Sequence, residues 1–117
     1  MAGKDILGRN GEQLAAQFLE AGGYRIVERN WRGRRGELDI IAELDGTTVF
    51  VEVKTRSTFA FGHPFEAITP RKLRALRRLA GEWCAASASR GRIRLDAIAV
   101  VGGDEGPARI EHLRGIG

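Results

Sequence analysis

The sequence predicts an α/β domain in which a mixed central sheet is flanked by helices. Two observations predict this fold: a hairpin signal at Asp45-Gly46 between two alternating apolar runs, and an apolar segment at 93–101 that follows an amphipathic helical stretch. The hairpin is antiparallel, whereas a strand that is apolar on both faces and follows a helix is typical of a parallel pair. We expect one domain spanning 1–117, long enough to bury a hydrophobic core.

The N-terminal part predicts a helix followed by a strand. Apolar residues recur at helical spacing over 5–21, and Gly22-Gly23 provides a left-handed end to that helix. Gly11 falls on the apolar arc, where we expect it to allow close helix packing. Residues 24–31 alternate and are rich in strand-forming types, so they predict a strand. Residues 32–36 then form a basic loop.

The hairpin predicts a definite register. Strands are expected over 37–44 and 47–55, and a two-residue loop makes Leu44 face Thr47. Counting back along the two strands places Asp39 directly across from Glu52.

The same register places Glu37 across from Lys54, and period-2 alternation puts all four charged side chains on one face. Facing carboxylates destabilise a sheet unless a cation lies between them. Lys54 is one candidate for that cation and a divalent metal ion is another. The alternative is a solvated hairpin face with ordinary surface charges, but the apolar residues on this face indicate that it is covered.

The C-terminal half predicts one helix and two strands. Residues 56–68 are irregular, and Thr69-Pro70 provides an N-cap and a first-turn proline for a helix that runs to about Ala88. Strands follow at 93–101 and 108–113, joined by a loop. A right-handed crossover through this helix would make the 93–101 strand parallel to the hairpin's second strand.

Charge indicates a polyanionic partner. The net charge is +4 and the sequence pI is about 10.0, with most of the basic residues being arginine. Nucleic acid is the usual partner of such a surface, although a solvated basic helix face would have the same composition. Lys72 differs from the other helix cations, because its helical-wheel angle falls inside the apolar stripe. The candidate phosphate-binding residues are Arg32, Arg34, Arg35, Arg56, Arg71, Lys72 and Arg74.

Other features exclude several classes of protein. No apolar run is long enough to span a membrane, and the N-terminus lacks the apolar stretch of a signal peptide. Cys84 is the single cysteine, so no internal disulfide can form and a cytoplasmic location is expected. We expect His63 and His112 to be structural, and Asp96 to be buried and satisfied by backbone groups or an arginine.

The acidic residues suit phosphodiester hydrolysis. Asp39 and Glu52 would hold Mg²⁺ or Mn²⁺, which prefer carboxylate oxygens, and Glu12 at the edge of the first helix could reach the same ion. Lys54 would lie beside the metal, where it could orient a water molecule or stabilise charge on the attacked phosphate. Glu37 is a weaker candidate that could simply pair with Lys54 or an arginine.

These residues also carry a family resemblance. Asp39 followed by Glu52-x-Lys54 on the next strand resembles the PD-(D/E)XK nuclease motif, although Leu38 stands where that motif usually has proline. More closely, the chain resembles the YraN-like family of small bacterial proteins. The matching stretches are Gly8-x-x-Gly11-Glu12-x-x-Ala15, Asn30-Trp31-Arg32, Gly36-Glu37-Leu38-Asp39-Ile40-Ile41, Val49-Phe50-Val51-Glu52-Val53-Lys54-Thr55-Arg56, Thr69-Pro70-Arg71-Lys72 and Arg94-Leu95-Asp96.

The resemblance implies a restriction-endonuclease-like core and a metal-dependent DNA endonuclease similar to Holliday junction resolvases. It gives the active-site positions to Glu12, Asp39, Glu52 and Lys54. Branched or junction DNA is the favoured substrate, in a role in DNA repair and recombination, and a homodimer is expected if that substrate is right. The alternatives are a nucleic-acid-binding module with little activity alone and a nonenzymatic interaction scaffold.

Overall fold

The structure, a computed structural model, describes residues 3–60, 62–102 and 106–117, and the side chains from residue 10 onwards within them. Its five strands form one sheet in the order β1-β2-β3-β4-β5. Only the β3–β4 pair is parallel within this sheet, and the other three pairs are antiparallel. The elements are α1 (Gly3–Ala21), β1 (Arg25–Arg32), β2 (Glu37–Leu44), β3 (Thr47–Arg56), the short 3-10 helix η1 (Pro64–Ala67), α2 (Pro70–Ser87), β4 (Arg92–Val101) and β5 (Arg109–Leu113).

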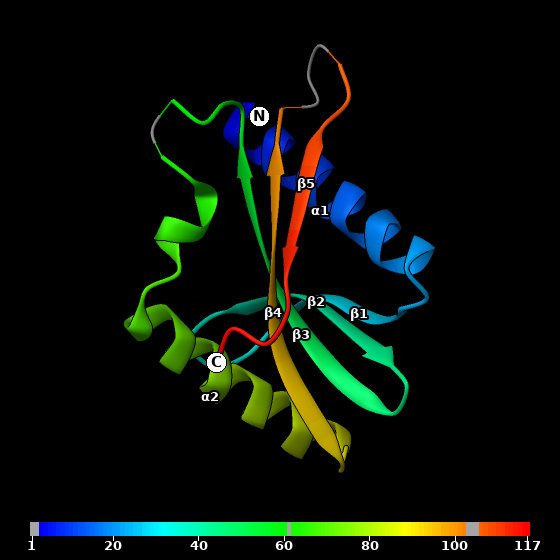
Figure 1. Cartoon of the computed structure of the whole chain (residues 1–117). Helices are drawn as coiled ribbons and strands as arrows, with labels where there is room; N and C mark the ends of the chain where they lie inside the picture. The colour runs from blue at the N-terminus through cyan, green and yellow to red at the C-terminus, as the bar shows by residue number, and fades with distance from the viewer. Residues whose placement is uncertain (1–2, 61, 103–105) are drawn as a thin grey trace.

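The predicted fold class is therefore confirmed. A mixed central sheet lies between two helices, and the arrangement is compatible with a restriction-endonuclease-like core (Figure 1). Each predicted helix and strand is present, with ends that differ by one or two residues. The predicted loop at 102–107 includes residues 103–105, which lie outside the described residues. In the part of the chain that the structure describes, no helix is long and apolar enough to cross a membrane.

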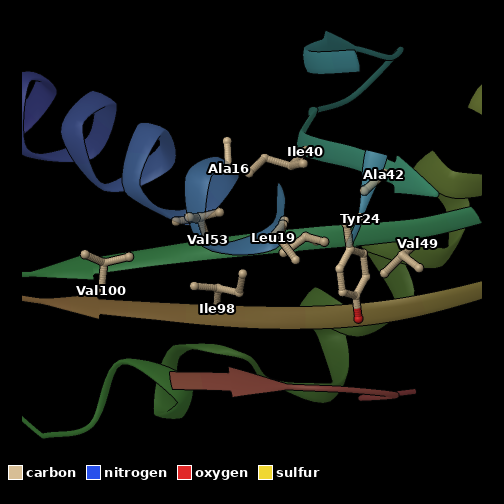
Figure 2. Packing of buried hydrophobic residues seen from close by; sticks show 11 residues of the cluster. Ala16, Leu19, Tyr24, Ile40, Ala42, Val49, Val53, Ile98 and Val100 are labelled. Carbon is tan, nitrogen blue, oxygen red and sulfur yellow. The ribbon is translucent and has the colours of Figure 1, made fainter. Parts of the chain in front are cut away.

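Each helix covers its own face of the sheet. Ala15, Ala16 and Leu19 of α1 pack against the valines of β3 and against Ile40 and Ile98, as Figure 2 shows. Burying these alternating aliphatic side chains away from water is the main force that holds α1 on the sheet.

On the opposite face, the buried stripe of α2 packs against Ile41 and Phe50 of the hairpin and Leu95 of β4. The indole of Trp83 meets the Phe50 ring edge-on, with ring centroids 5.7 Å apart. Thr69 caps the helix, because its side chain accepts a hydrogen bond from the Lys72 N–H at 3.2 Å. The predicted N-cap is thus confirmed.

The hairpin register is confirmed near the turn. Asp45 and Gly46 have φ values of 50° and 80°, as a type I′ turn requires. The pairing runs as predicted from Leu44 opposite Thr47 to Ile40 opposite Val51.

Beyond that point the predicted register is wrong. The described β2–β3 pairing stops at Ile40, so Asp39 is not paired through its backbone with Glu52, and Glu37 is not paired with Lys54. β3 continues to Arg56 with β4 as its parallel neighbour (Figure 1). The two strands of the hairpin therefore separate into a fork, whose branch point is Asp39.

Helix α1 crosses β3 just beyond this fork. A Cβ atom on Gly11 would lie 2.5 Å from Thr55 Oγ1, a distance that side chains do not reach. The expected role of Gly11 in close helix packing is thus confirmed, and the crossing brings the neighbouring Glu12 to the fork.

Candidate active site

The site begins with an irregularity in β2. Leu38 and Ile41 lie in the same apolar cluster, although residues three apart point to opposite faces of a regular strand. Across from this point on β1, Asn30 has a left-handed backbone with φ of 52°. Here β2 stays paired with β1 but separates from β3, and the Asp39 carboxylate takes the place of a backbone acceptor for β3. Its Oδ2 accepts a hydrogen bond from the Val53 N–H at 2.8 Å.

This irregularity of β2 brings the carboxyl groups of Asp39 and Glu52 together. Glu52 is 5% exposed. Burial, a hydrogen bond to Glu52 and the charge of that residue together raise the pKa of Asp39 to about 8, against the lowering effect of the Val53 N–H. Asp39 therefore keeps its proton near neutral pH, where a free aspartic acid would have lost it. The expected proximity of these two side chains is present, although it arises from the fork and not from a direct backbone pair.

The cation closest to this pair comes from α2. Lys72 Nζ lies 3.3 Å from Glu52 Oε2. Lys54, predicted to lie beside Glu52, is half-buried and makes no hydrogen bond or ion pair with a described residue. The same Glu52 oxygen is buried and accepts no hydrogen bond from the described residues. Buried carboxylate oxygens are rarely left in this condition.

Glu12 reaches the fork but is held by an amide. Asn30 Nδ2 donates to Glu12 Oε1 at 2.7 Å and to Glu37 Oε1 at 3.1 Å. The charge of Glu12 contributes to the raised pKa of Asp39, so the two carboxyl groups are close enough to interact. Glu37 also pairs with Arg32 at 3.4 Å, which makes its cationic neighbour an arginine and not Lys54.

These residues fit a divalent cation in part. The raised pKa of Asp39, and the Glu52 Oε2 that lacks a hydrogen bond from the described residues, are consistent with a site for a hard cation. Across the residues described, however, no group of three His, Cys, Asp or Glu side chains is close enough to hold a metal ion. Glu12 could serve as a third ligand after its carboxylate leaves Asn30.

The predicted phosphate-binding residues differ in exposure. Arg32, Arg34, Arg35, Arg71 and Arg74 are exposed, whereas Arg56 and Lys72 are half-buried. Arg34 and Arg35 line a hollow of about 490 Å³ together with Arg78 and Glu82 of α2.

The loop between β1 and β2 is fixed on α2. The Arg34 N–H donates to Glu82 Oε1 at 3.0 Å, and a Cβ atom on Gly33 would lie 2.6 Å from Leu79 Cδ2. The loop and the helix therefore present one continuous basic surface. Sequence analysis did not place Arg78 among the binding residues, although its position on the outward stripe of the helix could have indicated it.

Two further residues of the site were not assigned to it from sequence. Asn30 holds Glu12, and its signal was its residue type, because asparagine is uncommon within strands. Lys72 was predicted to bind phosphate, but its side chain lies against Glu52. The helical-wheel angle of Lys72, which placed a cation among buried residues, could have indicated this position.

The comparison with known proteins shows the family to which the chain belongs. The sequence profile described as "Uncharacterised protein family UPF0102" matches residues 11–100, a span that includes the fork and the start of α2. The chain belongs to the UPF0102 family. The resemblance to the YraN-like family is thereby confirmed.

Relatives match the UPF0102 chain along its whole length. A UPF0102 protein of Beutenbergia cavernae is 53% identical over 118 residues and covers 100% of both chains. One from Leifsonia xyli subsp. xyli is 55% identical and covers 99% of each chain. A third, from Frankia alni, is 47% identical and covers 98% of this chain and 97% of its own.

Proposed function

We propose that this UPF0102 protein is a metal-dependent endonuclease that hydrolyses phosphodiester bonds in DNA, with branched or junction DNA as its substrate. The observation that carries the proposal is the Asp39–Glu52 pair, in which the pKa of Asp39 is raised and a buried Glu52 oxygen lacks a hydrogen bond from the described residues. Two neighbouring acids destabilise a fold even with the Lys72 ammonium 3.3 Å from Glu52, so such a pair is a candidate functional site.

The residues of the fork would divide the chemistry. Asp39 and Glu52 would hold Mg²⁺ or Mn²⁺, with Glu12 as a third ligand, and the bound ion would supply charge stabilisation and an activated water. In hydrolysis, the water oxygen bonds to phosphorus, and the bond from phosphorus to one sugar oxygen breaks as that oxygen gains a proton. Lys54, which has no partner among the described residues, could contact the attacked phosphate.

The arginines would position the substrate. Guanidinium groups in the loop and on α2 contact backbone phosphates without reading bases, which suits an enzyme that recognises the shape of DNA. Replacing Arg34, Arg35 and Arg78 together with alanine should weaken DNA binding for all sequences and lower its salt dependence by about two to three phosphate contacts. Fluorescence anisotropy at several salt concentrations measures both. An unchanged salt slope would place the DNA elsewhere.

Cleavage assays test the reaction itself. Labelled junction, flap, duplex and single-stranded DNAs are incubated with Mg²⁺ or Mn²⁺, and the products are separated on denaturing gels. Wild type should cut the branched substrates, and Asp39→Asn and Glu52→Gln should each reduce the rate by about 100-fold or more. Glu43→Gln is the matched control, because Glu43 lies on the same strand and pairs with Arg25 at an exposed position. Absence of cleavage and of Mn²⁺ binding by calorimetry would contradict the proposal.

A second candidate is a nucleic-acid-binding module that cleaves poorly unless a partner completes the site. The contact that favours it is Asn30 to Glu12, because it occupies an oxygen of the carboxylate that would serve as the third metal ligand. This alternative predicts salt-dependent DNA binding and Mn²⁺ binding without cleavage of any substrate in the panel.

A further inference from the structure

Lys72 is an unusual residue for this chain. The sequence has sixteen arginines and only three lysines, Lys4, Lys54 and Lys72. Arginine thus supplies most of the positively charged side chains of this sequence. The Lys72 ammonium nevertheless lies 3.3 Å from a Glu52 oxygen that is buried and has no hydrogen bond from the described residues.

The start of α2 fixes the direction of this side chain. The Lys72 N–H is held by Thr69 Oγ1, and Lys72 occupies the first position of the stripe that continues through the buried Leu76, Leu79 and Trp83. The Lys72 side chain is 39% exposed, so it connects a buried acid with solvent, whereas Arg71 and Arg74 on either side of it point outward.

We propose that Lys72 is the resident counter-cation of Glu52, and that a divalent ion displaces its ammonium, which then becomes available to a phosphate of bound DNA. The inference rests on the proposed function. A buried carboxylate without a cation is costly, so an ion pair keeps the site folded when no metal is bound. Two cations at the same buried oxygen repel one another, so metal binding removes the reason for Lys72 to stay.

The residue type supports the exchange. An ammonium is a compact point charge on a flexible stem, so it can leave one oxygen and reach another group nearby. Arginine would bind a carboxylate through two parallel hydrogen bonds and would be harder to displace. A chain that uses arginine almost everywhere else but keeps lysine against Glu52 is consistent with a contact that must break.

Amine acylation measured by mass spectrometry at each lysine tests the exchange directly. The full chain is treated with an acetylating reagent with and without MnCl₂, and wild type is compared with Glu52→Gln and Glu43→Gln. Without metal, Lys72 should react several-fold more slowly in wild type than in Glu52→Gln, because its ammonium is held by Glu52. Mn²⁺ should raise the Lys72 rate several-fold. In Glu52→Gln, Lys72 should react quickly from the start and not respond to Mn²⁺, whereas Glu43→Gln should behave as wild type.

The outcomes separate this inference from the proposed function. Equal Lys72 rates in wild type and Glu52→Gln without metal would overturn the ion pair. A Lys72 that stays slow while calorimetry shows bound Mn²⁺ would overturn the exchange, with the nuclease proposal intact. Exchange without cleavage of any DNA would overturn the nuclease proposal alone. Absence of Mn²⁺ binding would overturn both the exchange and a metal-dependent enzyme.

Metal affinity gives a second, independent measurement. Lys72→Met removes the competing charge with little change in side-chain length, and should tighten Mn²⁺ binding about tenfold. Arg77→Met is the matched control, because it removes one positive charge from an exposed position of the same helix without a contact to Glu52, and should change the affinity less than about threefold. Equal effects of the two substitutions would mean that general charge, and not a contact, governs the affinity.

Discussion

Two acidic residues on the strands that flank β3 have opposite surroundings. Asp96 on β4 is fully buried. Arg94 donates to both of its oxygens at 2.8 and 2.9 Å, His112 Nε2 lies 2.8 Å away, and the Gly115 N–H donates at 3.0 Å. Asp39 on β2 accepts a hydrogen bond from the Val53 N–H, and its other neighbour is the carboxyl group of Glu52.

The two pKa values move in opposite directions for this reason. Burial raises the pKa of Asp96, but the hydrogen bonds from His112, Arg94 and Gly115 outweigh it and lower the value to about 2. Burial, the hydrogen bond to Glu52 and the charge of that residue together raise the pKa of Asp39 to about 8. Asp96 has the surroundings of an acid that holds a fold together, and Asp39 those of a candidate functional acid.

The largest effect on stability should come from replacing Asp96, whose carboxylate is hydrogen-bonded by Arg94 and Gly115. Asp96→Asn removes the charge that balances Arg94 and should reduce the free energy of unfolding by about 3–5 kcal/mol. Because the pKa of Asp96 is lowered, its contribution is complete above the unfolded value near 4 and is lost as pH falls toward 2. The deficit of the variant should therefore be constant from pH 5 to 8 and shrink below pH 4. Urea denaturation across this range measures it, and a deficit of less than 1 kcal/mol would contradict the comparison.

At the Asp39–Glu52 pair, the substitution that should most reduce the rate of cleavage is Lys54→Met. Lys54 makes no ion pair with the described residues, so its loss should change the free energy of unfolding by less than about 1 kcal/mol. If its charge acts on the transition state, cleavage should fall by roughly 100-fold or more while DNA binding stays within a few-fold. Melting temperature and single-turnover cleavage of the same variant separate the two roles. A lower melting temperature with wild-type cleavage would make Lys54 structural.

The pH dependence of Asp39 should be opposite in sign to that of Asp96. Its pKa is raised from 3.8 to about 8, so its stabilising contribution is present below pH 4 and is lost as pH rises through 8. Asp39→Asn carries no such loss. The variant should become more stable than wild type as pH rises from 5 to 9, by about 1–3 kcal/mol after allowance for the partial exposure of the side chain. Thermal melts at several pH values, with Glu43→Gln as the control, measure this trend; a constant difference would refute it.

Local sequence signals predicted most of the fold. The two turn residues and the alternating apolar runs fix the hairpin as far as Ile40, because both act between residues that are close in sequence. Thr69 and Pro70 likewise fix the start of α2.

The fork could not be predicted in the same way. It depends on the left-handed Asn30 across from Asp39, and on the contact of Gly11 with Thr55, which join parts of the chain far apart in sequence. Extrapolating the regular ladder therefore predicted the proximity of Asp39 and Glu52 for the wrong reason. It also predicted Lys54 as the cation beside Glu52, whereas the cation found there is Lys72 of α2.

The loop seated on α2 has a consequence for how a polyanion would be captured. Gly33 lies against Leu79, and Glu82 holds the Arg34 N–H, so the loop backbone is already ordered in the free protein. Little backbone entropy would be lost on binding, and the remaining cost would be the ordering of the exposed arginine side chains. We therefore expect association close to that of two rigid bodies, with a rate governed by electrostatic attraction and not by folding of the loop.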